Sequence, residues 1–377
     1  MPSLCQNLIK EYQTIKTLNR EFDLEYQKAA ATGNWEKAKE LKAGLEQKRD
    51  ALQEKLWPFE GLPIKEAKGQ YEKAISGYRE FGWLKTLTSG QEGIIGENGQ
   101  EYPVPSFREI QKGLIANKEF FAEKFATLEN SRIHLTPFAL SPAAMADGYG
   151  RLIEDHFTEI RVEGDRRIPD KNKTKLFGVD GEPLELRADK QNIYFSGLFN
   201  NLTYFPEWQE KKGSVEAAGG MTKEEALAKL GGWQIIIIED IPLAPEKGQG
   251  KIIEKEIKIK GKIKKVKRTQ VVGGLNAAEQ YKLLKRQNEV GFTTEDWISF
   301  AALHLKEKKV VLDDDKSTIY YCRLLGASTA DGLVPCAYWG RRYRRASLFR
   351  DYPGPHGGYW YWGVRGAVRV EILKFKP

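Results

Sequence analysis

The sequence is poor in cysteine and has no long apolar run. Three cysteines (Cys5, Cys322 and Cys336) are too few for a disulfide framework, and their odd number favours a reducing compartment. The apolar run Ile235–Ile238 has the length of a strand, far below what crossing a bilayer requires. Residues 1–7 lack the basic start and apolar core of a signal peptide. We therefore expect no membrane span and, by default, a cytoplasmic location.

The sequence also lacks the common catalytic and metal-binding motifs. No G-x-G-x-x-G follows a strand pattern, and neither a Walker loop nor H-E-x-x-H is present. Asp313–Asp315 lacks the rest of a calcium-loop pattern, so we expect a solvated turn there. His134 and His156 have no metal-ligand spacing and are expected to be structural. The sequence predicts no catalytic residue, no metal site, no cofactor and no enzyme activity.

The chain does carry an excess of positive charge, and this charge is unevenly distributed along the sequence. The formal net charge is +8 over 377 residues, which raises nucleic acid or an acidic surface as partners. Much of it lies in Lys251–Arg268, where Lys alternates with Ile. This pattern predicts a β-hairpin turning at Gly261, with one apolar and one basic face. We expect a solubilising edge hairpin; a nucleic-acid-binding stripe is the alternative.

The N-terminal residues have helical periodicity. One stripe of apolar side chains runs from Leu8 to Tyr26 and a second from Ala38 to Leu56, with a break at Gly33 and Asn34. Residues 1–57 are thus predicted to form a helical hairpin that acts as a spacer or an oligomerisation element. Residues 58–158 are predicted to be a helical accessory region, with a helix over Phe107–Leu128 capped by Ser106 and a second helix opening at Ser141.

From about residue 159 the pattern changes to strands, such as Ile193–Phe195 and Gln234–Ile238, interrupted by helices. Thr222 and Thr293 each precede an acidic residue by three positions, as in a capping box, and a further helix is predicted over Asn276–Asn288. Strands and helices mix without βαβ alternation, which indicates an α+β fold. Residues 159–377 are therefore predicted to be one α+β domain that follows an all-α region.

The C-terminal segment combines aromatic residues and arginine with a sharp compositional gap. It reads AYWGRRYRRASLFRDYPGPHGGYWYWGVRGAVRV over residues 337–370. Between Ser317 and Val370 there is no Lys, Glu, Gln or Met, although the rest of the chain is rich in Lys and Glu. The base composition of the genome does not explain why this segment has arginine but no lysine while the rest of the same gene encodes many lysines.

The segments LLGASTADGLVPCAYW and WGVRGAVRV resemble the C-terminal region of variable proteins of diversity-generating retroelements. The upstream GGWQIIIIED and GFTTEDWISFAALHL are similar to that family's scaffold. The resemblance implies a C-type lectin-like fold, related to formylglycine-generating enzyme, over roughly residues 159–370. It also implies adenine-targeted mutagenesis, which turns Asn codons into codons for Tyr, Ser, Phe, Asp, His, Gly, Arg or Ala, but not for Lys, Glu, Gln, Met or Trp.

The resemblance implies a diversified binding surface in this segment, since large aromatic and small polar side chains are those that antibody loops use. Residues that the mechanism can generate are the expected ligand-binding positions: Tyr338, Gly340, Tyr343, Ser347, Phe349, Asp351, Tyr352, His356, Tyr359 and Tyr361. The expected fixed scaffold is Trp339, Trp362, Gly363, Val364, Arg365, Ala367 and Val368. Arginines 341, 342, 344 and 345 are expected to mix the two roles. The alternative is that the aromatic residues pack a β core.

The expected function is recognition of a macromolecular ligand, a protein rather than a nucleic acid, by an aromatic-rich hypervariable surface. Two other classes remain open. One is an oxidoreductase like formylglycine-generating enzyme, although Cys322 and Cys336 lie far apart and lack its paired-cysteine motif. The other is nucleic-acid binding through the basic hairpin, for which steep salt dependence would be the sign.

Overall fold

The computed structural model describes residues 4–57, 59, 61–156, 160–170, 176–196, 199, 201–240, 251–259, 262–271, 273–315, 321–354 and 362–370. At residues 4–10, 12, 49–50, 53–56, 259 and 362 it describes the backbone alone. The chain divides into two compact units, Met1–Lys65 and Glu66–Pro377, called here the N-terminal unit and the main unit.

The N-terminal unit contains two long helices that pack against each other, α1 (Leu4–Thr32) and α2 (Glu36–Leu56). Gly33 has a left-handed φ of 75° and donates its N–H to the carbonyl of Ala29, which ends α1 as a C-terminal glycine does. The side chain of Asn34 accepts the N–H of Glu36 at 3.3 Å and so caps α2. The predicted helical hairpin and its break are confirmed.

The main unit is built around a four-stranded antiparallel sheet with the order β15-β21-β12-β4. Its strands are β4 (Ser131–Thr136), β12 (Gln234–Glu239), β15 (Val290–Gly291) and β21 (Gly366–Val370). Ile235–Ile238 of β12 is buried along its whole length, because β4 and β21 flank it and helices cover the sheet. Helix α9 (Thr294–Lys308) packs on β4.

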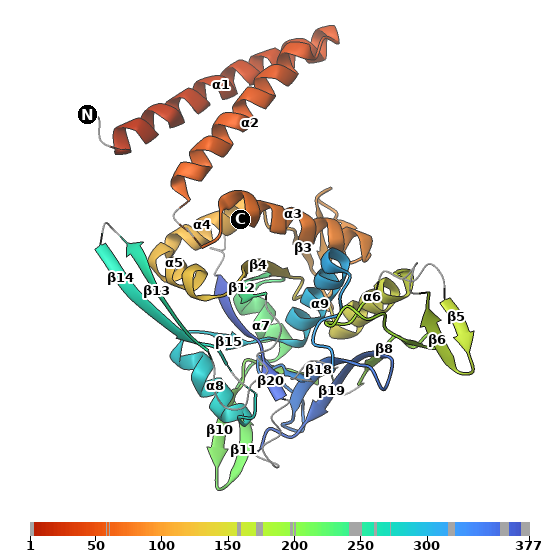
Figure 1. Ribbon diagram of the computed structural model, residues 1–377. Helices are drawn as coiled ribbons and strands as arrows, with labels where there is room; N and C mark the ends of the chain where they lie inside the picture. Colours follow the sequence, from red (N-terminus) through yellow and green to blue (C-terminus); the bar gives the residue numbers. More distant parts are fainter. Residues whose placement is uncertain are drawn as a thin grey trace. The chain divides into compact units, whose positions relative to one another are not determined.

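A second sheet carries most of the C-terminal segment. It has the order β20-β16-β18-β19-β8, with antiparallel pairing from β16 to β19 and parallel pairing at both edges. Its strands are β8 (Ile193–Phe195), β16 (Tyr321–Arg323), β18 (Val334–Gly340), β19 (Arg345–Asp351) and β20 (Trp362–Val364). Helix α6 (Pro142–Asp155) contacts both β8 and α9, and Figure 1 shows β18 and β19 side by side next to β8.

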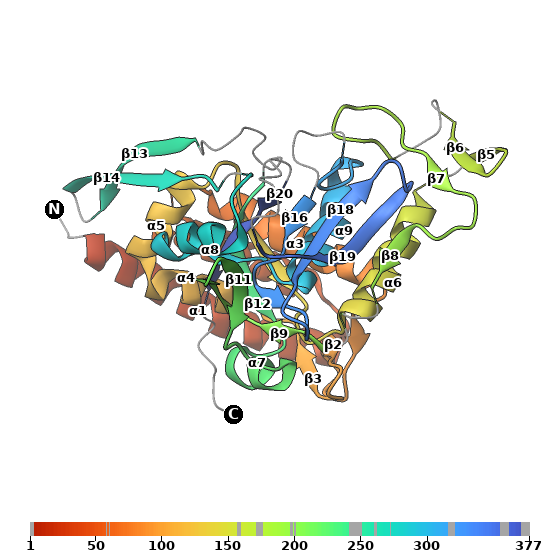
Figure 2. The same cartoon turned by 90° about the horizontal axis from the view of Figure 1, so that it is seen from below.

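The remaining strands form small sheets around these two. They are β1 (Lys85–Thr86), β2 (Glu92–Ile95) and β3 (Glu101–Pro103); β5 (Ile160–Glu163), β6 (Arg166–Pro169) and β7 (Leu186–Arg187); β9 (Thr203–Tyr204) with β17 (Ala327–Ser328); β10 (Glu207–Lys211) with β11 (Ser214–Ala218); and β13 (Ile252–Ile259) with β14 (Lys262–Thr269). The other helices are α3 (Ile64–Glu80), α4 (Phe107–Ala116), α5 (Lys118–Thr127), α7 (Lys223–Leu230) and α8 (Ala277–Arg286). Figure 2 shows α7 beside β9 and the β2–β3 hairpin.

The N-terminal ends of the helices follow the predicted caps. Capping boxes are present at Ser106, Thr222, Asn276 and Thr293, and Ser141 caps α6 with Pro142 in its first turn. The single helix predicted over Phe107–Leu128 was wrong, because the structure has two helices with a break at Asn117. The backbone of Asn117, with φ of −120° and ψ of 43°, lies outside helical geometry. Asparagine favours such positions because its side chain competes for backbone hydrogen bonds.

Helices and strands together make the protein α+β, as predicted. The prediction that the region before residue 159 is all helical was wrong, since β1, β2, β3 and β4 lie within it. Strand β4 pairs along its length with β12, which lies about 100 residues further on. Long-range pairing of this kind leaves no local pattern in the sequence. The boundary expected near residue 158 accordingly falls inside the main unit.

Candidate functional site

Strand alternation gathers several of the expected ligand-binding residues on one side of the second sheet. Tyr338 of β18 lies opposite Ser347 of β19, and Cys336 lies opposite Phe349. Residues directly opposite each other share a face, and successive residues in a strand alternate between faces. One face, called here the display face, therefore carries Tyr338, Gly340, Ser347, Phe349 and Asp351, together with Val334, Cys336 and Arg345. One end of this face is itself covered, because Val334 and Cys336 are buried in a core cluster against which Phe349 packs.

The other face of the same two strands is covered. Ala337, Trp339, Ala346 and Leu348 are at most 1% exposed. Ile193 of β8 pairs with Ala346 and lies under Gly150 of α6, where an added Cβ would come 3.1 Å from the Ile193 side chain. Helix α6 thus packs closely on this face. Trp339 is part of this buried face.

Aromatic side chains from three strands, β16, β18 and β19, cluster on the display face. The rings of Tyr321, Tyr338 and Phe349 meet edge to face, with centroids 4.4, 5.5 and 5.6 Å apart. Tyr338 is only 5% exposed, and burial raises the pKa of its hydroxyl. Ser347 and Gly340 are also buried. Three of the expected ligand-binding positions, Tyr338, Gly340 and Ser347, are therefore buried and pack against neighbouring residues.

The exposed expected positions lie at the two ends of the β18–β19 hairpin. Tyr343 in the turn is 47% exposed, and Tyr352, just after β19, is 60% exposed. Phe349 and Asp351 are half-buried. The remaining expected positions, His356, Tyr359 and Tyr361, lie outside the described residues.

The turn of the hairpin is held by one of its arginines. Arg341 donates from Nε to Oδ1 of Asp314 at 2.6 Å and from Nη2 to the other oxygen, and Nη2 also donates to Asp180 at 2.7 Å. Its backbone N–H donates to a carboxylate oxygen of Asp315 at 2.9 Å. Gly178 makes room for this arrangement, because a Cβ there would overlap the Arg341 guanidinium. Arg341 is therefore scaffold, whereas Arg342 beside it is exposed.

The prediction of a solvated turn at Asp313–Asp315 was wrong. Asp314 is fully buried and Asp313 is 5% exposed. Asp313 accepts hydrogen bonds from Arg365 and from the Trp297 indole at 2.8 Å. Three acidic residues in a row resemble a solvated turn in sequence, and the arginines that bury them lie far along the chain. Among the described residues, no group of acidic, histidine or cysteine side chains could hold a metal ion.

Sequence reasoning missed the neighbours that β8 supplies to the display face. Tyr194 pairs with Ser347 and so shares its face; Tyr194 is 42% exposed, and Arg345 lies 4.8 Å from its ring centroid. A cation over an aromatic ring is a favourable contact. The residues around Ile193–Phe195 had a strand pattern, but no local signal shows that they pair in parallel with β19.

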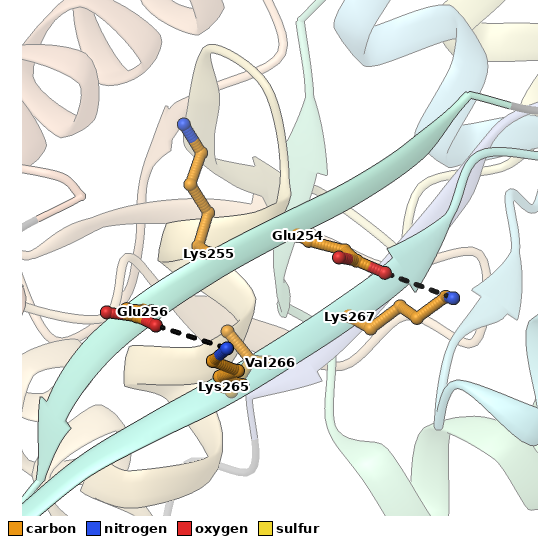
Figure 3. A pocket seen from close by; sticks show the side chains of 6 residues that line it. All are labelled: Glu254, Lys255, Glu256, Lys265, Val266 and Lys267. Atoms are coloured by element: carbon orange, nitrogen blue, oxygen red, sulfur yellow. Dashed lines mark ion pairs between the residues drawn. The ribbon is translucent and has the colours of Figure 1, made fainter.

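Glutamates offset part of the positive charge of the lysines on the surface of the β13–β14 hairpin. A surface pocket of about 360 Å³ lies on this hairpin. Lys267 pairs there with Glu254 at 3.1 Å and Lys265 with Glu256 at 3.6 Å. Figure 3 shows both ion pairs. The other face packs on α5, where Ile253 is buried. The two paired strands of the predicted hairpin are present, and the expected turn at Gly261 lies outside the described residues. The faces are not simply apolar and basic, because glutamates of β13 lie opposite lysines of β14 on the exposed face.

Cys322 and Cys336 are both buried, and neither forms a disulfide. Cys322 lies opposite Ala337, the neighbour of Cys336, so the two thiols lie on opposite faces of the sheet although their strands adjoin. Burial raises the pKa of each thiol well above its ordinary value. Neither cysteine is poised as a thiolate. His134 and His156 are buried beside Ser299 and the Leu305 carbonyl, as expected of structural histidines.

Comparison with protein-family models, with curated proteins and with solved structures finds no match for this chain. Among the described residues, no helix combines the length and apolar character needed to cross a membrane. The assignment of function therefore depends on the geometry described above.

Proposed function

We propose that this chain is a ligand-binding protein that presents a diversified, aromatic-rich surface to a protein ligand, in the manner of retroelement variable proteins. The binding surface is the display face together with the exposed residues at both ends of the β18–β19 hairpin. Its domain is of the C-type lectin-like type, and it has no catalytic role.

The observation that carries this proposal is the separation of roles by strand alternation. The expected variable residues of β18 and β19 share one face, and the invariant-type residues between them, such as Trp339, are buried on the other. A diversified surface needs this arrangement, because substitutions on one face leave the packing of the other unchanged.

The chemistry of the exposed residues suits recognition of a protein. Tyr194, Tyr343 and Tyr352 are all at least 42% exposed, and arginine accompanies them at Arg342 and Arg345. Tyrosine and arginine are enriched at protein interfaces, where they supply contact area and directional hydrogen bonds. The cysteines argue against the oxidoreductase alternative, and the paired lysines of β13–β14 weaken the nucleic-acid alternative.

The direct test is a pair of displayed libraries built on the full chain. The first randomises the ten expected positions among Tyr, Ser, Phe, Asp, His, Gly, Arg and Ala. The matched control randomises Ala337, Trp339, Ala346 and Leu348 with the same residues. Both are sorted first for folding and then by panning against unrelated proteins.

We expect many folded members and new specificities from the first library and few folded members from the control. Because Tyr338, Gly340 and Ser347 are buried, the folded members should vary least at these positions. Equal loss of folding in both libraries, or binding that never depends on the ten positions, would contradict the proposal.

A further inference from the structure

Arg345 lies on the display face between two exposed tyrosines. It is directly opposite Gly340 of β18, and the next residue of its face, Ser347, pairs with Tyr194 of β8 on the other side of β19. Tyr194 is 42% exposed, and Tyr343 in the turn is 47% exposed. The ring of Tyr343 lies against Gly340, since a Cβ there would come 3.1 Å from a ring atom. Figure 2 shows β18, β19 and β8 side by side.

The guanidinium of Arg345 is held in place by a ring rather than by a carboxylate. Its central carbon lies 4.8 Å from the ring centroid of Tyr194, which is a favourable cation–π contact. Its Nε is buried without a hydrogen-bond partner, and no carboxylate in the described part of the chain forms an ion pair with it. The residue is only half-buried, so the rest of the group reaches the surface. Arg345 therefore offers a positioned cation whose hydrogen-bond donors are unused.

The described carboxylates near Arg345 are already used by other arginines. Arg187 donates from Nε to the two oxygens of Asp189 at 2.9 and 3.1 Å. This hydrogen bonding, with a smaller contribution from the charge of Arg345, lowers the pKa of Asp189 to about 2. Asp165 pairs with Arg344 at 3.2 Å. Three arginines thus share two carboxylates, and a carboxylate supplied by a ligand would balance the third.

Strand β8 holds Tyr194 rigidly beside Arg345. The N–H of Ala346 donates to the carbonyl of Asn192 at 3.0 Å, which bonds the start of β8 to β19. Just after the other end of β8, the N–H of Ser196 donates to the carbonyl of Leu348 at 3.2 Å. A contact made by side chains that are already in position loses little conformational entropy on binding. Tyrosine and arginine in such positions are the residues that most often dominate the affinity of a protein interface.

Neither Tyr194 nor Arg345 is among the ten positions expected to vary, and Tyr194 lies outside the segment Ser317–Val370 altogether. We propose that Arg345, stacked on Tyr194, is a constant anchor of the display face that binds a carboxylate of an aspartate or glutamate on the protein ligand. The planar guanidinium matches a carboxylate at two points. The variable positions around the anchor then select among ligands that present such a carboxylate. This inference rests on the proposed function and names one chemical feature that its ligands share.

The test uses full-chain members of the first library that were selected against different proteins. Arg345→Ala and Tyr194→Ala are introduced into each member, and calorimetry with the protein used in its panning measures the affinity. For the majority of these proteins, we expect each change to weaken binding roughly tenfold or more, since a charge-assisted hydrogen bond or its support is lost. Arg345→Lys keeps the charge without the planar group, so it should weaken binding less than Arg345→Ala does.

Two further measurements separate contact with the ligand from support of the fold. Arg20→Ala and Tyr26→Ala, the same changes at exposed positions on α1, are the matched controls and should leave the affinities unchanged. Thermal melts establish that each variant is folded, and Arg345→Lys replaces Arg345→Ala in any member that the alanine unfolds. In each ligand, the exposed aspartates and glutamates are changed one at a time to asparagine and glutamine. One of these changes should lose its effect when it is combined with Arg345→Ala.

The outcomes distinguish this inference from the proposed function. A library that yields no binder overturns the proposed function, and the anchor with it. Binders whose affinities are in the majority unchanged by both Arg345→Ala and Tyr194→Ala leave the proposed function standing and overturn the anchor. A loss of affinity that is coupled to no carboxylate of the ligand also overturns it, because Arg345 would then support the display face without binding the ligand.

Discussion

Arg341 and Asp314 form a two-point ion pair that fixes the turn between β18 and β19. Both the Nε and the Nη2 groups of Arg341 donate to the carboxylate, which is itself fully buried and also accepts the N–H of Val179 at 3.1 Å. The planar guanidinium matches a carboxylate at two points, which lysine cannot do. The exposed Tyr343 thus stands on a turn whose start is anchored in the body of the main unit.

We predict that Arg341→Ala destabilises the protein by about 3 kcal/mol, since it leaves the buried Asp314 without its cation. Arg341→Lys should restore only part of this loss, because it supplies charge without the two-point geometry. Urea unfolding measures the free energies. Arg342→Ala removes the same side chain from an exposed position of the same turn and should cost about 0.5 kcal/mol or less. Equal costs at positions 341 and 342 would show that the ion pair does not hold the turn.

We predict that substitutions at buried and at exposed aromatic residues of the hairpin differ strongly in their cost to stability. Trp339→Ala truncates a fully buried side chain and should cost about 3–5 kcal/mol. Tyr343→Ser, at a site 47% exposed, should cost about 0.5 kcal/mol or less. Thermal melts of the two variants compare them. A tyrosine change as damaging as the tryptophan change would mean that the aromatic residues of the turn are core.

Local signals in the sequence predicted the helices better than the sheets. The caps at Ser106, Thr222 and Thr293 were readable because a capping box lies within four residues. Strand β4 and the parallel pairing of β8 with β19 were not readable, because their partners are distant in the chain. Whether a segment forms a strand depends on its pairing partners more than whether a segment forms a helix does.

The candidate site was predicted in part for a similar reason. Composition pointed to the segment around β18 and β19, and alternation then places Tyr338 and Ser347 on one face. The burial of Tyr338 was not predictable, because it depends on Tyr321 and Phe349 meeting its ring. Asp314 was misjudged because Arg341, which neutralises it, lies on another element.

We predict that the main unit folds without the N-terminal helices. The helices α1 and α2 pack against each other, and contacts divide the chain at Lys65. Removing residues 1–56 should leave a soluble protein that unfolds in a single cooperative transition in urea, as the full chain's main unit does. Aggregation of the shortened chain, or a broad transition with no cooperative step, would contradict this prediction.

The last prediction concerns His134, which makes stability depend on pH. It is fully buried on β4, and burial lowers its pKa from the ordinary 6.5 to about 3, with Arg132 adding to the effect and Asp296 and Asp240 opposing it. One ring nitrogen faces Ser299 at 2.8 Å, and the other has no hydrogen-bond partner among the described residues. The folded protein therefore keeps this ring neutral.

Because the folded pKa lies below that of the unfolded chain, the unfolded state binds more protons between pH 6.5 and about 3, and stability falls as the pH is lowered through this window. From about pH 7 to about pH 5 this group alone should remove about 2 kcal/mol. Urea unfolding of the protein and of His134→Gln at both pH values isolates the effect, since all other titrating groups are common to the two chains. His134→Gln should lose about 2 kcal/mol less than the unmodified protein over this interval. An equal loss in both would mean that His134 is protonated in the folded state and that its burial does not set its charge.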